Sequence, residues 1–251
     1  MTGQMTRYLV FRLYGPMVSW GDVAVGGTRP SADHPTRSAI MGLLAGALGL
    51  RRDEEQAHLE LDAALGLAIY AWSTGQLLRD YHTIQTPHER RNERYYTRAD
   101  ELAATSIGTV LSQRDYRCDA LFDIAVWLQG EETAFSLDSL MKALRQPGFV
   151  PYLGRKACPL ALPLLPRVVA AEHCLAAFQA AQAQRPEDEA KLFAPITRQA
   201  GSAPALYWEG DPAAPLPAQQ TVTRRDRAYS RSRWQFSSRE EHFAWVPEEQ
   251  T

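Results

Sequence analysis

Short apolar runs alternate with segments of helical periodicity along this chain, and the two patterns predict most of its elements. Three runs are rich in β-branched and aromatic residues and predict strands: Tyr8–Leu13, Leu67–Trp72 and Asp119–Leu128. Between Thr36 and Gly49 the apolar residues recur at helical spacing. Thr36 or Ser38 is a suitable N-cap for that helix, and Gly49 is suited to end it.

Further helices and strands are predicted on the same grounds. The helices are Asp53–Leu65, Ser136–Gln146 and Ala170–Gln184, and the later strands are Ala205–Glu209 and Gln219–Tyr229. The order strand, helices, strand, insertion, strand, helix is typical of a ferredoxin-like or RRM-like half. We therefore expect an α+β fold, with an RRM-like domain over residues 1–150 and a small C-terminal β-containing subdomain over 151–251. The insertion, at about Arg79–Arg117, is polar and rich in arginine, and predicts a long protruding hairpin.

Charge is distributed unevenly, although the formal net charge is only −2. No acid lies between Asp138 and Glu172, a window that contains five basic residues. A second basic run, Arg224–Arg239, contains Asp226 as its one acid. Local patches decide what a surface binds, so nucleic acid is a plausible partner, and the C-terminal arginines are expected to face RNA or a neighbouring subunit.

Several classes of protein are not expected. The chain has no run of roughly twenty apolar residues, and Arg7 and Arg12 interrupt the apolar start, so neither a membrane span nor a signal peptide is predicted. Three widely spaced cysteines fit a cytoplasmic protein without disulfides. The histidines lack the spacing of metal ligands, and no Walker motif is present, so we expect no metal and no other cofactor.

The loop and helix over Gly27–Gly49 are the first candidate binding site. A helix N-terminus presents free N–H groups and the positive end of its dipole, and is therefore suited to a phosphate. Thr36 and Ser38 lie at that N-terminus, and Arg29 and Arg37 flank it with forked donors. The alternative is an ordinary capped helix with solvated arginines, and spacing alone does not separate the two.

The motif PYLGRKACPL is the second candidate. Tyr152 offers a stacking face, Gly154 permits close approach of a backbone, and Arg155 and Lys156 supply positive charge. Such mixtures of aromatic faces and cations bind single-stranded RNA. The alternative is a rigid turn with charged residues on its surface.

Tyr81 and His82 are the nearest approach to a ribonuclease pair, with Lys156 as the cation that a metal-independent mechanism needs. Contact with RNA, or closure of the base of the hairpin, is the favoured interpretation. Within the hairpin, arginines alternate with tyrosines, but nearby acids make a solvated hairpin nearly as plausible. These residues are Arg90, Arg91, Arg94, Arg98, Tyr95 and Tyr96.

Five ordered blocks resemble the Cas-five family of type I-E CRISPR Cascade complexes. They are Arg7–Gly21, Gly27–Gly49, Leu78–Thr83, Arg114–Leu128 and Pro151–Leu164, with a weaker likeness at Gln235–Phe243. The resemblance implies a modified ferredoxin-like (RRM-like) fold with a thumb-like hairpin insertion. It also implies a non-catalytic, RNA-binding subunit that holds the 5′ handle of the CRISPR RNA. Such a subunit caps the backbone-subunit filament beside the large subunit, meets target DNA only through the complex, and supports antiviral defence.

The resemblance favours RNA contact at both candidate sites and at Arg117, where the hairpin ends. Relatives from type I-C systems cleave RNA with a Tyr, Lys and His constellation, which has no clear counterpart in this sequence. Two alternatives stay open: a metal-independent endoribonuclease that processes precursor CRISPR RNA, and a scaffold that binds only proteins.

Overall fold

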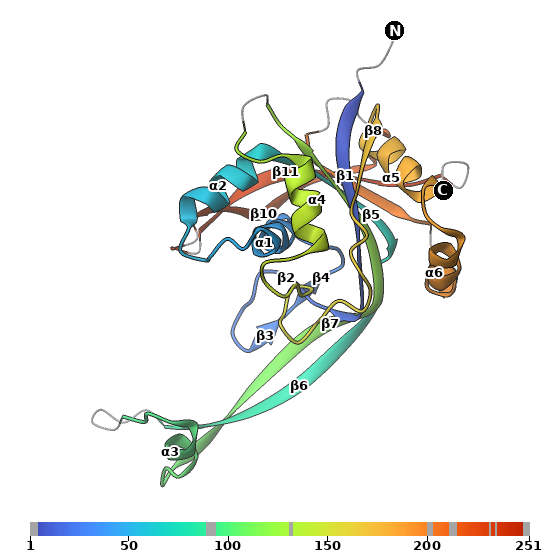
Figure 1. The fold of residues 1–251 in the computed structure, drawn as a ribbon. Coiled ribbons are helices and arrows are strands. Elements are labelled where there is room, and N and C mark those ends of the chain that lie inside the picture. The colour runs from blue at the N-terminus through green and yellow to red at the C-terminus, as the bar shows by residue number, and fades with distance from the viewer. Residues whose placement is uncertain are drawn as a thin grey trace.

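A nine-stranded sheet forms the centre of the computed structural model, which describes residues 5–88, 94–130, 133–199, 203–210, 215–230, 232–233 and 235–247. Seven of its strands follow the order β10-β11-β9-β5-β7-β1-β8 (Figure 1). Their bounds are β1 Thr6–Val18, β5 Leu65–Ser73, β7 Ile107–Leu128, β8 Arg167–Ala171, β9 Ala205–Trp208, β10 Gln220–Ser230 and β11 Gln235–Trp245. The remaining strands are β2 Trp20–Gly21, β3 Thr28–Arg29, β4 Ser31–Ala32 and β6 Gln76–Pro87, of which β2 and β4 form a separate pair.

Helices cover both faces of this sheet, which explains why its central strands are apolar throughout. In β1, Phe11 belongs to the core shared with α1 (Arg37–Leu48), α2 (Glu55–Ala64) and α4 (Leu137–Arg145). Its neighbour Val10 belongs to the core shared with α5 (Cys174–Ala183) on the other face. This alternation of Val10 and Phe11 between the two faces follows from the two-residue period of a strand. A further helix, α6, spans Glu187–Gln199.

The predicted ends of α1 and α4 are confirmed. The Thr36 hydroxyl accepts a hydrogen bond from the Ala39 N–H, and Gly49 ends α1 with a φ of 79°. This left-handed conformation favours glycine, and it lets the Gly49 N–H bond to carbonyls of the last turn. Ser136 caps α4 in a reciprocal pair with Ser139.

A long antiparallel ribbon projects from the body (Figure 1). It consists of β6 and the first half of β7, paired from Gln76↔Cys118 to Pro87↔Ile107. The short helix α3 (Arg98–Leu102) lies at its far end. The insertion predicted at 79–117 falls within this ribbon and its tip. At the base of the ribbon, β3 pairs in parallel with β7, so that Arg29 lies opposite Arg114.

The C-terminal strands do not form a sheet of their own. β9 pairs with β5, β11 with β9, and β10 with β11, so the main sheet continues across the predicted boundary at residue 150. The strands predicted at Ala205–Glu209 and Gln219–Tyr229 are confirmed as β9 and β10. β11 and α6 were not predicted.

One predicted helix begins too early. Residues 170 and 171 belong to β8, which pairs with β1, and α5 begins only after His173, whose side chain caps it. The strand is short, and its pairing partner lies about 160 residues earlier in the chain, so local periodicity could not identify it. No helix among the described residues has the length and hydrophobicity needed to cross a membrane.

Candidate nucleic-acid interface

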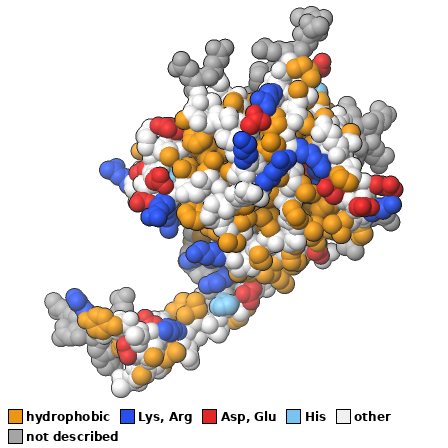
Figure 2. All heavy atoms as spheres, in the orientation of Figure 1, with side chains coloured by type: hydrophobic (Ala, Val, Ile, Leu, Met, Phe, Trp, Pro, Cys, Tyr) orange, Lys and Arg blue, Asp and Glu red, His pale blue; other side chains and the backbone are white. Residues whose placement is uncertain are grey.

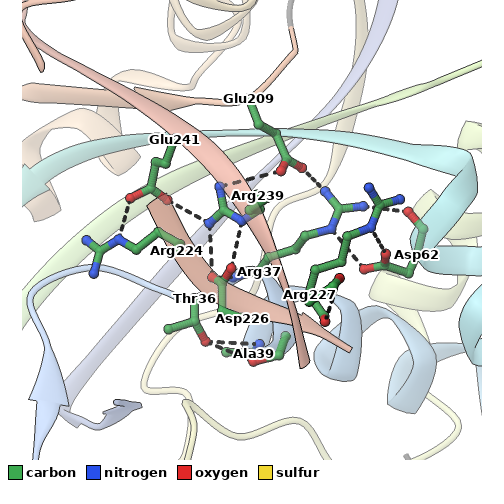
Figure 3. Close-up of polar contacts among 12 residues, drawn as sticks. Thr36, Arg37, Ala39, Asp62, Glu209, Arg224, Asp226, Arg227, Arg239 and Glu241 are labelled. Atoms are coloured by element: carbon green, nitrogen blue, oxygen red, sulfur yellow. Dashed lines mark hydrogen bonds and ion pairs between the residues drawn. The ribbon is translucent and has the colours of Figure 1, made fainter. Parts of the chain in front are cut away.

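Arg37 lies inside the protein, in contradiction to its predicted role as a phosphate ligand. Its side chain is 2% exposed. Its Nε donates to Asp62 Oδ1 at 2.8 Å, its Nη2 donates to the Leu65 carbonyl at 2.8 Å, and its Nη1 contacts Glu209 (Figure 3). Because this guanidinium is itself buried and two carboxylates already hold it, it has no face left for RNA.

The N-terminus of α1 does bind an anion, but the anion belongs to the protein. The Arg37 N–H donates to Asp226 Oδ2 at 2.7 Å, and Arg239 holds the same carboxylate through Nε at 2.7 Å (Figure 3). Thr36 acts as the N-cap, and its hydroxyl also lies 3.2 Å from that of Ser38. The predicted affinity of this helix end for negative charge is thus correct, whereas the predicted RNA contacts of Thr36, Arg37 and Ser38 are not supported. Asp226 fills the place that a phosphate would take.

The C-terminal arginines belong largely to this same network. Arg224 pairs with Glu241 at 2.8 Å and Arg227 with Asp62 at 2.8 Å, while Arg239 also contacts Glu209 and Glu241. Arg239 is 6% exposed and therefore does not face RNA or a neighbour, whereas Arg224 and Arg227 are paired but stay partly exposed, and for them the prediction stays open. Arg225 and Arg233 remain exposed, and Arg231 lies outside the described residues.

A buried histidine completes the network. His34 Nε2 lies 3.0 Å from Glu241 Oε1, and Nδ1 lies 2.6 Å from Asp33 Oδ1. Burial lowers the pKa of His34, but these two carboxylates outweigh that effect and raise the pKa above its ordinary value. The pKa of Glu241 is lowered, because the hydrogen bond from His34 and the nearby arginines outweigh its burial.

The base of the β6–β7 ribbon brings other predicted residues together. Arg29 is exposed on β3, opposite Arg114 of β7. Arg155 Nη2 donates to the Arg29 carbonyl at 3.1 Å, and its guanidinium lies over the Tyr116 ring at 4.7 Å. Figure 2 shows Lys and Arg side chains, with a histidine beside them, where the ribbon leaves the body. We call the group Arg29, Arg114, Tyr116, Arg155 the ribbon-base cluster.

A tight turn presents the PYLGRKACPL residues beside this cluster. Leu153 is buried, and it bonds through its carbonyl to the Ser19 N–H at 3.1 Å and through its N–H to the Cys158 carbonyl at 2.7 Å. Gly154 has a φ of 83°, and a Cβ there would lie 1.8 Å from the Ser19 carbonyl oxygen. The close approach predicted for Gly154 is therefore to the protein's own backbone. Tyr152 and Lys156 are left exposed on the turn.

Asp115 is an acid within this basic region, and it is paired. Arg79 holds it through two hydrogen bonds of 2.8 and 3.1 Å. The hydrogen bond from Arg79 lowers the pKa of Asp115, so the carboxylate stays charged. Arg117, half-buried at the same end of the ribbon, donates to the Gly75 carbonyl at 3.4 Å. The arginines of the ribbon-base cluster have no carboxylate partner among the ion pairs of the described residues.

Tyr81 and His82 are both exposed on β6, opposite Gln113 and Ser112 respectively. Successive residues of a strand point to opposite faces, so these two side chains do not converge on one phosphate. The Nδ1 atom of His82 instead lies 3.0 Å from Asp80 Oδ2. The arrangement does not form an acid–base pair, although either residue alone is accessible to RNA.

Toward the tip of the ribbon, Arg98 pairs with Glu101 at 2.5 Å. Arg94 and Tyr96 are exposed, and Arg90 and Arg91 lie outside the described residues. Sequence reasoning missed Arg114 and Tyr116 as individual site residues. The alternation of charged and aromatic residues in RDYR, on a strand, was the signal that could have identified them. The described residues contain no cluster of groups suited to a metal ion.

Comparisons with known proteins agree with this architecture. A family model described as CRISPR-associated protein (Cas_Cas5) matches residues 8–241. The CRISPR system Cascade subunit CasD of Escherichia coli (strain K12) is 37% identical over 170 residues, which cover 64% of this chain and 70% of that protein. A chain of a solved structure described as a CRISPR RNA-guided surveillance complex is 26% identical, with a TM-score of 0.61 over 97% of this chain and 90% of that one. A structure described as a Cas protein, 22% identical, shares the fold with a TM-score of 0.57 over 97% of each chain. Because the family model spans nearly the whole sequence, the chain belongs to the CRISPR-associated Cas5 (Cas-five) family.

Proposed function

We propose that this protein is a subunit of a type I-E CRISPR Cascade surveillance complex that holds the 5′ handle of the CRISPR RNA without cleaving it. The ribbon-base cluster is the observation that carries the proposal. Arg29 lies opposite Arg114, and Arg155 covers the ring of Tyr116, which is itself buried in the core. Tyr152 offers an exposed ring and Lys156 an exposed cation on the neighbouring turn. Forked cations next to aromatic rings suit the phosphates and bases of single-stranded RNA.

The fold supports the same proposal. We interpret the sheet and its helices as a modified ferredoxin-like domain and the β6–β7 ribbon as its thumb. The ribbon is exposed along β6, including Leu77, Tyr81 and Ile84, and a free apolar surface of this kind needs a partner. In the proposed complex, the backbone subunit and the RNA that it carries cover the ribbon. The large subunit lies beside the body, target DNA is reached through the complex, and the complex acts in the cytoplasm.

The salt dependence of RNA binding tests the site. The slope of log K against log salt is negative, and each phosphate contact that is lost reduces its magnitude by about 0.7 for a single strand. Arg29→Ala together with Arg155→Ala should therefore reduce the magnitude of the slope by about 1.4 in the assembled complex. Arg51→Ala, which removes an exposed arginine from the loop between α1 and α2, is the matched control. An unchanged slope in the double variant, or a complex whose RNA fails to cross-link to this chain, would favour the scaffold that binds only proteins.

The proposed lack of cleavage has its own test. Pure protein incubated with precursor repeat RNA in EDTA should leave the RNA intact, because Tyr81 and His82 point to opposite faces of β6. A discrete cut that disappears in His82→Ala or Tyr81→Phe would replace the proposal with a metal-independent endoribonuclease.

A further inference from the structure

The main sheet has a free edge at β8. This strand ends the strand order, and within the described part of the chain its only strand partner is β1, from Thr6↔Ala171 to Val10↔Arg167. A hollow of about 580 Å³ runs along this edge. Its lining includes Arg7, Met141, Arg145, Arg167, Val168 and Gln184.

The hollow surrounds the edge instead of lying over one face of the sheet. Met141 and Arg145 come from α4, which covers one face, and Gln184 caps α5, which covers the other. The backbone of β8 lies between them. An edge of this kind, with unpaired N–H and C=O groups, is a template for an added strand.

A second hollow, of about 540 Å³, continues from the first and shares Arg145 and Arg167 with it. Its walls are apolar and rich in proline, including Leu144, Pro147 and Pro163. An extended segment that pairs with β8 would therefore find an apolar pocket for its side chains next to the strand edge.

Two of the three arginines at this edge have a carboxylate partner, and one of them is Arg167, which lies 3.5 Å from Glu189. Arg7 pairs with Asp138 at 3.0 Å, but both side chains are more than half exposed. Arg145 bonds only to the Pro166 carbonyl, at 3.4 Å, and has no acid partner among the described residues. Lys142, one turn along α4 from Asp138, is exposed on the same helix. Figure 2 shows Lys and Arg side chains gathered over this part of the body, next to a broad apolar area.

Single-stranded nucleic acid and an extended peptide are the two classes of ligand that could bind such a surface. Sites for single-stranded nucleic acid use aromatic rings as stacking faces, and the described residues that line the two hollows include none. Apolar pockets beside an open strand edge suit an extended peptide, and the unpaired cations suit carboxylates.

We infer that the β8 edge binds an extended, acidic segment of a neighbouring protein subunit, which adds a strand to β8. Its carboxylates lie against Arg145 and Lys142, and its apolar side chains enter the hollow lined by Leu144 and Pro163. The inference rests on the proposed function, because the complex supplies the partner.

The lysine content of the chain allows a direct test. Its three lysines are Lys142, Lys156 and Lys191. A carbodiimide joins a lysine amine to a carboxylate in direct contact, without a spacer. In the assembled complex, Lys142 should cross-link to an Asp or Glu of another subunit, and Lys142→Arg should abolish that link while keeping the charge. Amide hydrogen exchange in residues 167–171 should slow at least tenfold between the isolated chain and the complex.

A charge reversal at Arg145 tests the same interface by mutation. Arg145→Glu should weaken association with the subunit captured at Lys142 by about tenfold, whereas Arg51→Glu, at an exposed site, should not. Unchanged exchange at 167–171 in a complete complex, or a cross-link from this edge to RNA, would overturn the inference. If Arg145→Glu leaves assembly intact while the Arg29 and Arg155 variants lose RNA, this inference fails and the proposed function stands.

Discussion

Replacement of Arg37 by alanine should destabilise the protein, but the contacts between the protein and RNA should stay the same. The side chains of Asp62 and Glu209 are 8% and 12% exposed, and each would lose the cation that it contacts from inside the protein. Removal of one member of a buried ion pair costs about 3–5 kcal/mol. Arg227 still reaches Asp62, and Arg239 still reaches Glu209, so we expect the lower end, about 3 kcal/mol.

Urea unfolding and thermal melting measure this cost. At about 2–4 °C per kcal/mol for a chain of this size, the melting temperature should fall by about 6–12 °C. Arg227→Ala is the matched control: it removes an arginine from the same Asp62 carboxylate, but Arg227 is 41% exposed, so the cost should stay below about 1 kcal/mol. Arg37→Met, which retains most of the volume, should lose nearly as much stability as Arg37→Ala, because charge and not packing dominates.

RNA binding separates the two interpretations of Arg37. At a temperature at which the variant is folded, the salt slope of guide binding should equal that of the wild type. The assignment of Arg37 to the interior network would be refuted by two results together. The salt slope of Arg37→Ala would be smaller in magnitude than that of the wild type by about 0.7, and the unfolding free energies of the two proteins would agree within about 0.5 kcal/mol.

Three further changes probe the fold. His34→Gln should cost the most stability at low pH, because the pKa of His34 is raised in the folded state. The stabilisation by His34 is fully present below its ordinary pKa of 6.5 and is lost as the pH rises through the folded-state pKa. Urea unfolding of both proteins between pH 6 and 9 measures this difference. Asp123→Asn should cost about 3–5 kcal/mol in the same assay, since this buried carboxylate holds Arg12 at 2.9 Å and Arg185 at 2.8 Å; a loss below 1 kcal/mol would contradict that reasoning. Gly154→Ala should cost more than about 1 kcal/mol, because a Cβ cannot fit beside the neighbouring carbonyl at a φ of 83°; equal stability of the two proteins would show that the turn relaxes.

Local signals were enough to predict many elements. Gly49 and Ser136 lie where a helix end and a helix cap need those residue types, and the apolar runs of β5 and β9 are short and distinct. β8 was not predicted, and its last two residues were assigned to a helix, because its strand character depends on pairing with β1, which is remote in the sequence.

The candidate site was predictable only in part, for the same reason. The motif around Arg37 correctly indicated an anion at the start of α1, but that anion is Asp226 of β10. The acids that hold the Arg37 guanidinium are Asp62 of α2 and Glu209, which directly follows β9. No local pattern reveals that such distant acids will be adjacent. Arg29 and Arg155, in contrast, are held mainly by backbone contacts, which leaves their positive charge without a carboxylate, as the motifs suggested.

The continuation of the sheet from β5 into β9, β11 and β10 has a consequence for biosynthesis. The ribosome makes α1 and β5 first, and the carboxylates of Glu209 and Asp226 follow only after the β6–β7 ribbon, α4 and α5. Until then the Arg37 guanidinium lacks Glu209, the Arg37 N–H lacks Asp226, and β5 lacks its outer neighbour β9. The nascent body therefore cannot close before β9, β10 and β11 leave the exit tunnel. A message truncated before β9 would yield a product that exposes the outer edge of β5 to chaperones and proteases.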